Sequence, residues 1–163
     1  MCSSREANLN PNHINRSWAL LFARLVVGLI FFMAGFWKTF QLGPLEHARK
    51  YFLPFSDTFL PTWSLWAVGV VIPFVELIAG ALVILGLRIR DASVSLGLVL
   101  AVVTFGHLLK EPLYEFHTHV IPRLILVLFI LVMPREDDKF SIDYVLNRWR
   151  TRTAGAGVDG AST

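Results

Sequence analysis

Residues 62–87 read TWSLWAVGVVIPFVELIAGALVILGL, an apolar run of 26 residues that contains one charged side chain, Glu76. A helix needs about 20 predominantly apolar residues to cross the hydrocarbon core of a bilayer, so this run predicts a transmembrane helix. Three further apolar runs lie at about residues 17–40, 91–109 and 116–133. The sequence therefore predicts an all-α fold, an integral membrane four-helix bundle formed by residues 17–133.

The composition of the 163-residue chain supports a membrane protein, with 55% apolar and 17% charged residues. Soluble domains contain about 45–50% apolar and about 25% charged residues, and a body this small cannot bury so much apolar surface. These proportions exclude a disordered chain, a disulfide scaffold and a protein that binds nucleic acid through a basic tail. The single cysteine, Cys2, permits neither an internal disulfide nor dithiol chemistry within the chain.

The positions of Lys and Arg predict the orientation, because basic residues are enriched on the cytoplasmic side of membrane spans. Nine lie on one side, namely Arg5, Arg16, Arg88, Arg90, Arg135, Lys139, Arg148, Arg150 and Arg152, and four lie on the other, namely Lys38, Arg49, Lys50 and Lys110. Both termini are therefore predicted to be cytoplasmic, in a multi-pass protein of the inner (cytoplasmic) membrane of the cell. The first span is too long for a signal peptide and lacks a small-x-small cleavage site, so we expect it to be retained.

The segments outside the spans have distinct compositions. Residues 1–16 form a polar leader, and residues 41–61, which are rich in aromatic side chains, predict either a short interfacial helix or a loop that follows the membrane surface. Residues 134–152 predict a second amphipathic segment on the inner leaflet, with basic residues near anionic lipid. Residues 153–163 are rich in Gly, Ala, Ser and Thr and are predicted to be disordered.

Three ionisable side chains lie deep in the predicted spans: Arg24, Glu76 and Arg123. An unpaired charge at that depth costs several kcal/mol, so we expect Glu76 to pair with Arg24 or with Arg123. The three residues form either a structural ion-pair core or a ligand site. The excess of positive charge favours the second interpretation, a pocket suited to a carbonyl, an oxyanion or a quinone oxygen.

Small residues share helix faces with these charges. Gly28, Gly35, Gly80 and Gly97 are expected to let the helices approach one another closely. Pro73 has no backbone N–H, so the Gly69 carbonyl one turn earlier should lack its helical donor, which predicts a kink beside Glu76.

A second polar group lies near the outer ends of the spans and comprises Lys38, His107, Glu111 and His119, together with Lys110, Tyr114, Glu115 and His117. Its histidines could bind a metal or, with His107 and His119 as axial ligands, a haem. A hydrated loop with interfacial histidines is the preferred interpretation, and no metal site is predicted. The chain contains no CxxC, HExxH, P-loop or GxGxxG motif, so no catalytic residue is assigned.

Several short patterns occur in a distinctive order. They are Arg24-x3-Gly28, Gly35-x2-Lys38, Glu76-x3-Gly80, then Leu82 to Gly86 leading into Arg88 and Arg90, and Ser141-Ile142-Asp143-x2-Leu146 in the tail. Over about residues 17–146 the chain thereby resembles the DoxX family of small four-span membrane proteins. The resemblance implies a four-helix bundle with an oxidoreductase-associated role, because the family includes the quinone-reducing membrane subunit of a thiosulfate:quinone oxidoreductase and assembly partners in thiol-oxidation complexes. The longer first outer segment, Arg123 and the histidine group depart from the family pattern, so no particular substrate follows.

Three functions remain open at this point. The first is a quinone-interacting or membrane-anchoring subunit of an oxidoreductase complex, which binds no covalent cofactor and receives electrons from a soluble or membrane redox partner. The second is a non-catalytic membrane partner or assembly protein whose polar core is purely structural. The third, a small-solute carrier, is disfavoured by the absence of internal repeats and by the small number of spans.

Overall fold

The computed structural model of the protein describes residues 11–110, 118, 120–134 and 138–149, and within them the regular elements are all helical. The elements are α2 (Pro11–Phe36), the π-helix η2 (Trp37–Leu42), α3 (Pro44–Tyr51), the 3-10 turn η3 (Leu53–Phe55), α4 (Thr62–Leu85), α5 (Ile89–Lys110) and α6 (Val120–Val132). Residues 142–149 form a further short helix. Short helices therefore occur in both segments outside the spans where the sequence predicted them.

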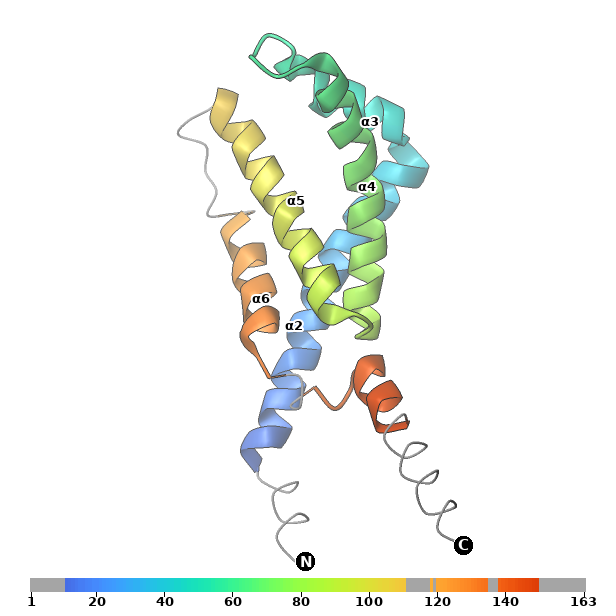
Figure 1. Cartoon of the computed structure of the whole chain (residues 1–163), viewed down its shortest axis with the longest axis vertical. Coiled ribbons are helices and arrows are strands. Elements are labelled where there is room, and N and C mark those ends of the chain that lie inside the picture. Colours follow the sequence, from blue (N-terminus) through green and yellow to red (C-terminus); the bar gives the residue numbers. More distant parts are fainter. Residues whose placement is uncertain (1–10, 111–117, 119, 135–137, 150–163) are drawn as a thin grey trace, which may run out of the picture.

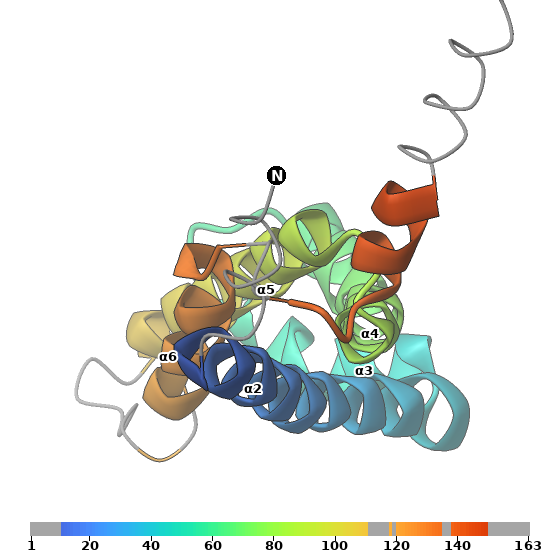
Figure 2. The same cartoon turned by 90° about the horizontal axis from the view of Figure 1, so that it is seen from below.

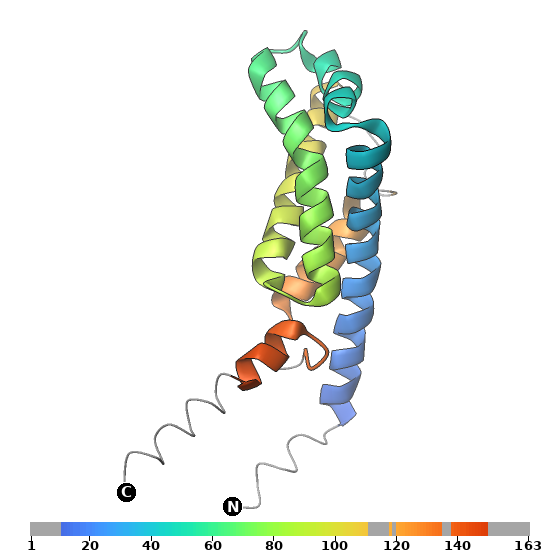
Figure 3. The ribbon, with the colours of Figure 1, turned by 90° about the vertical axis from the view of Figure 1, so that its right-hand side faces the viewer.

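Four helices form the bundle (Figure 1). Helix α4 packs between α2 and α5, α5 packs against α6, and α6 returns to contact α2, so that the helices close into a ring when viewed along the bundle (Figure 2). The start of α2, the connection between α4 and α5 and residues 138–149 lie at one end, which we call the termini end (Figure 3). Helix α3 covers the opposite end, the α3 end.

Three segments are long and apolar enough to cross a membrane: Ile14–Leu42, Thr62–Leu85 and Ile89–Leu109. Helix α2 covers Pro11–Phe36 and therefore includes residues that precede the predicted start of the first span. The fourth predicted span began at residue 116, whereas α6 begins at Val120 and has 13 residues, or roughly 20 Å. Residues 111–117 and 119 lie outside the described residues, so the four-span count stays a prediction.

The outward faces of these helices are apolar. On α2 and the following η2, large side chains are exposed at intervals of three or four residues: Trp18, Phe22, Val26, Leu29, Met33, Phe36 and Phe40. Soluble monomers rarely expose a continuous apolar stripe of this extent. Lipid is the solvent that such a surface fits.

Glycines make the contact between α2 and α4 close. A Cβ atom added at Gly35 would collide with the backbone nitrogen of Leu77 and would lie 2.8 Å from the Pro73 carbonyl oxygen. One added at Gly80 would lie 2.6 Å from the backbone nitrogen of Phe32. Gly28 faces Ile84 in the same interface, and a Cβ added there would lie 2.6 Å from the Ile84 side chain. Gly97 differs, because a Cβ there would meet Val127 at an ordinary 3.9 Å.

This contrast predicts different effects for two identical substitutions. We expect Gly35→Ala to lower the melting temperature in detergent and to cost about 1–3 kcal/mol, because backbone atoms of α4 must move away. Gly97→Ala has room for its methyl group and should be neutral or slightly stabilising, since alanine favours helix. Equal melting temperatures for the two variants would contradict the close packing of α2 on α4.

Candidate functional site

The main polar site lies between α2 and α4, toward the α3 end. Lys38 Nζ donates a hydrogen bond to Glu76 Oε2 at 2.6 Å, and the Glu76 side chain is 6% exposed. Lys38 stands on the π-helix η2, a rare helical form that is often found at functional sites. Thr39, the next residue, has a buried hydroxyl with no hydrogen-bond partner among the described residues.

This pairing corrects the expectation that Glu76 would pair with Arg24 or Arg123. Helical side chains point toward the N-terminus of their own helix, which for Lys38 is the middle of the bundle, so its long side chain reaches Glu76 from the end of the span. Arg24 precedes Lys38 by fourteen residues, roughly 21 Å along a helix, and contacts a different level of α4. Lys38, assigned from the sequence to the outer polar group, therefore belongs to the deep site.

Arg123 approaches the same site from α6. Its guanidinium carbon lies 6.0 Å from the centre of the buried Phe31 ring, and its charge acts on the Glu76 carboxylate. Among the described residues, Arg123 makes no hydrogen bond or ion pair, and Lys38 contacts only one oxygen of Glu76. The site thus combines two cations and one anion, with capacity left to bind an oxygen atom that carries negative charge.

Helix α3 covers this site and is hydrogen-bonded to α4 at the point where Pro73 interrupts the helical hydrogen bonds of α4. The Gly69 carbonyl, which lacks a donor because Pro73 has no N–H, accepts a hydrogen bond from Nδ1 of His47 at 2.7 Å. Gly69 also allows close approach, since an added Cβ would lie 2.7 Å from the Cα of Ala48. The sequence predicted the unsatisfied carbonyl, and the structure supplies its donor from α3.

The His47 ring is buried, and its Nδ1 can donate to the carbonyl in the neutral as well as in the charged imidazole. Burial lowers the pKa of the imidazole below its ordinary value, the bond to Gly69 opposes this, and the charge of Lys38 lowers it further. The folded protein therefore binds fewer protons at this site than the unfolded chain, between the lowered pKa and the ordinary value of about 6.5. Stability must rise with pH in that window and must be lost as the pH falls through it.

A pH series tests this coupling. The free energy of unfolding should fall as the pH is lowered from 7.5 to 5.5, by at most about 1.4 kcal/mol per pH unit for one proton. His47→Gln can keep a donor for the Gly69 carbonyl without titrating, so its profile should be flatter over this range. Between pH 7.5 and 8.5 the two proteins should have parallel profiles. An unchanged slope in His47→Gln would show that another group carries the pH dependence.

Arg24 lies in a separate network at the termini end. Its side chain is 1% exposed, and one guanidinium nitrogen, Nη1, donates to both carboxylate oxygens of Asp138, at 2.6 and 2.7 Å. It also donates to the carbonyls of Val83 and Ile84, both at 3.1 Å, where α4 ends. Burial raises the pKa of the Asp138 carboxyl, and the Arg24 charge opposes that rise. Because its donors are engaged in this way, Arg24 connects α2 to α4 and to the segment after α6. It does not belong to the candidate ligand pocket around Glu76.

The remaining members of the predicted outer group do not form a site in the described part of the chain. His107 Nδ1 bonds the Val103 carbonyl of its own helix at 2.8 Å. Glu111 and His119 lie outside the described residues. No group of three His, Cys, Asp or Glu side chains that could hold a metal is found among the residues that the structure describes.

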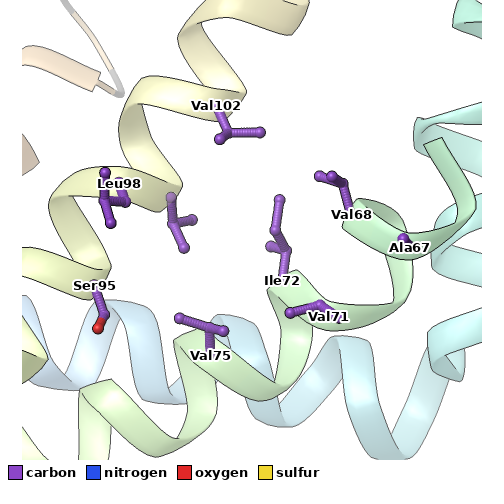
Figure 4. Close-up of a pocket in the computed structure, with 9 residues that line it drawn as sticks. Ala67, Val68, Val71, Ile72, Val75, Ser95, Leu98 and Val102 are labelled. Carbon is purple, nitrogen blue, oxygen red and sulfur yellow. The ribbon is translucent and has the colours of Figure 1, made fainter. Parts of the chain in front are cut away.

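An apolar groove of about 400 Å³ opens between α4 and α5 (Figure 4). Its lining consists of Ala67, Val68, Val71, Ile72 and Val75 from α4 and Ser95, Leu98, Val99 and Val102 from α5. The Ser95 hydroxyl donates to the Asp91 carbonyl at 2.8 Å and is thus satisfied within its helix. The groove therefore suits an alkyl or isoprenoid chain. Val75 directly precedes Glu76, so the groove lies at the same level of α4 as the carboxylate, on a neighbouring face of the helix.

Sequence reasoning missed two residues of these networks, His47 and Asp138. His47 had a usable signal, because a carbonyl without a donor at Gly69 requires a donor from outside α4. Asp138 belongs to an acidic run after α6, and this run lies at the same end of the bundle as the Arg24 side chain. Its signal was the presence of a carboxylate near the end of the span that carries Arg24.

Comparison with known families gives one finding. The DoxX family matches residues 19–108, which include most of α2, all of α3 and α4, and most of α5. No curated protein and no solved structure matches the chain. The matched region contains Lys38, His47 and Glu76, whereas Arg123 and Asp138 lie beyond it.

Proposed function

Because the chain belongs to the DoxX family, as its match over residues 19–108 shows, we propose that it is the quinone-interacting membrane subunit of an oxidoreductase complex. The observation that carries the proposal is the buried Lys38–Glu76 pair, with Arg123 as a second and more distant cation whose charge reaches Glu76. A purely structural pair would need one cation for one carboxylate. The second cation leaves a net positive site inside the bundle.

The residues of the site suit a quinone oxygen. Reduction of a quinone to a quinol takes up two electrons and two protons, and the electrons would come from a redox partner protein. The Lys38 ammonium and the Arg123 guanidinium would donate hydrogen bonds to the oxygen on which negative charge develops. Glu76 would hold and transfer one of the two protons at that oxygen, and water would supply the second. The groove between α4 and α5 would accommodate the isoprenoid tail.

The orientation belongs to the same proposal. We place the termini end of the bundle in the cytoplasm and α3 on the opposite side of the inner membrane, with α6 completing a fourth span. The basic residues Arg16, Arg88, Arg90, Lys139 and Arg148, all at the termini end, support this orientation. Labelling of single cysteines from either side of the membrane tests this orientation. A cysteine introduced within residues 53–60 should react only with reagent added outside, and Arg88→Cys should react only with reagent added inside.

Quinone binding can be measured directly. Protein purified in detergent is extracted with organic solvent to detect co-purifying quinone, and is then titrated with a short-chain quinone while tryptophan fluorescence is followed. We expect Lys38→Met and Arg123→Gln to weaken binding by at least about 10-fold, the effect of losing one charged hydrogen bond. Arg49→Gln, which changes an exposed cation on α3, should leave binding unchanged. Equal affinity in all four proteins would overturn the site.

The second candidate is a non-catalytic membrane partner. The fully engaged Arg24–Asp138 network favours it, because such contacts are typical of a rigid scaffold. Absence of co-purifying quinone, together with recovery of an intact complex on isolation from native membranes, would support this function over the first.

A further inference from the structure

The helix formed by residues 142–149 is attached to the bundle by its polar side. Ser141 caps it, because its Oγ accepts a hydrogen bond from the Tyr144 N–H at 3.1 Å. The Asp143 N–H donates to the Gly86 carbonyl at 3.1 Å, and its carboxylate accepts from the Ile89 N–H at 3.3 Å, at the start of α5. Just before this helix, Asp138 is bound by Arg24.

The opposite face of the same helix is apolar and exposed. Ile142, Val145 and Leu146 are 39%, 51% and 45% exposed, and Trp149 continues their i, i+3, i+4, i+7 spacing. A helix packed on a soluble protein normally buries its apolar face and exposes its polar one. Here the arrangement is inverted, so the apolar stripe is directed at something other than the bundle.

The surface around this stripe indicates what covers it. Phe140, two residues before the helix, packs its ring against Trp18 of α2 with centroids 4.9 Å apart. Trp18 belongs to the row of exposed apolar side chains along α2, so one apolar surface runs from a membrane span onto the short helix. Lys139 and Arg148 add positive charge beside it. Aromatic side chains next to basic ones are typical of the boundary between acyl chains and anionic headgroups.

We propose that residues 140–149 form an interfacial anchor, which lies on the leaflet at the termini end and inserts Ile142, Val145 and Leu146 among the lipids. The contacts of Asp138 and Asp143 fix the position of the anchor relative to the end of α4 and the start of α5. These helix ends therefore lie at a constant distance from the bilayer surface. A partner protein would need to displace lipid from this face. The inference does not depend on quinone binding.

Spin labels on two sides of the helix test the proposal. In a Cys2→Ser background, Val145→Cys places the label on the apolar face and Asn147→Cys places it on an exposed position of the polar side. The protein is reconstituted in lipid nanodiscs of phosphatidylcholine, with and without phosphatidylglycerol. Accessibility to oxygen, which concentrates in lipid, is compared with accessibility to a water-soluble nickel chelate.

We expect the Val145 label to be several-fold more accessible to oxygen than to nickel, and the Asn147 label to show the reverse. Phosphatidylglycerol should increase the contrast, because Lys139 and Arg148 lie beside anionic headgroups. Equal accessibility to nickel at both positions would overturn the proposal. Nickel access at Val145 in nanodiscs combined with protection in native membranes would also overturn it, and would identify a protein partner on this face.

Discussion

Arg24→Met should be among the most destabilising single substitutions in this protein, costing about 3–5 kcal/mol of unfolding free energy. The variant leaves the buried Asp138 carboxylate without its guanidinium, and it leaves the Val83 and Ile84 carbonyls short of a donor. Thermal unfolding in detergent measures the loss. Arg24→Lys should recover only part of it, because one ammonium cannot make the same set of planar bonds.

A matched control uses another arginine with a carboxylate partner. Arg49 pairs with Glu46 at 3.4 Å on the exposed surface of α3, where such a pair contributes about 0–1 kcal/mol. Arg49→Met should therefore unfold close to the wild-type temperature. The double variant Arg24→Met with Asp138→Asn should be more stable than Arg24→Met, since no buried charge is left alone. Wild-type stability in Arg24→Met would show that the ion pair contributes nothing to the fold.

The second large effect is expected at Glu76. Glu76→Ala leaves Lys38 and Arg123 inside the bundle without a counter-charge, and it should cost about 2–4 kcal/mol, less than a fully buried pair because Lys38 can extend toward water. Glu76→Gln should cost less, because its amide oxygen still accepts a hydrogen bond from Lys38. Melting temperatures in detergent should fall in the order wild type, Glu76→Gln, Glu76→Ala.

A charge-free version of the pair separates stability from function. Replacing Lys38 and Glu76 together by glutamine removes both charges and keeps groups that can bond to each other, so the protein should remain folded. In membranes that contain the redox partner, we expect this folded protein to support little quinone reduction, because the site has lost its proton donor and one cation. Full activity in the folded double variant would favour the structural role of the pair.

Three of the four spans could be predicted, because apolar length is a local property of the chain. The partners of the charges could not, because helical spacing identifies the face of a helix on which Arg24, Glu76 and Arg123 lie and says little about which side chain each one meets. Lys38 reaches Glu76 through the direction and length of its own side chain. Asp138 reaches Arg24 from a segment outside the spans, whose path no periodicity describes.

The contact between α3 and α4 shows how far local reasoning extends. Pro73 at its position requires that the Gly69 carbonyl find another donor, and this followed from the chemistry of proline alone. The identity of the donor depended on how residues 41–61 fold back over the bundle. The sequence therefore predicted that some hydrogen-bond donor must meet this carbonyl. Only the three-dimensional structure identifies that donor as His47.

The bond between Arg24 and Asp138 also sets an order of events during synthesis. The two residues are 114 positions apart, so at about 5–20 residues per second the ribosome delivers Asp138 roughly 6–23 s after Arg24. For that interval the first helix holds a guanidinium whose carboxylate has not yet been made. Insertion of α2 is thus provisional until Asp138 has been synthesised, and a nascent chain stopped after residue 134 should remain a substrate for membrane quality-control proteases.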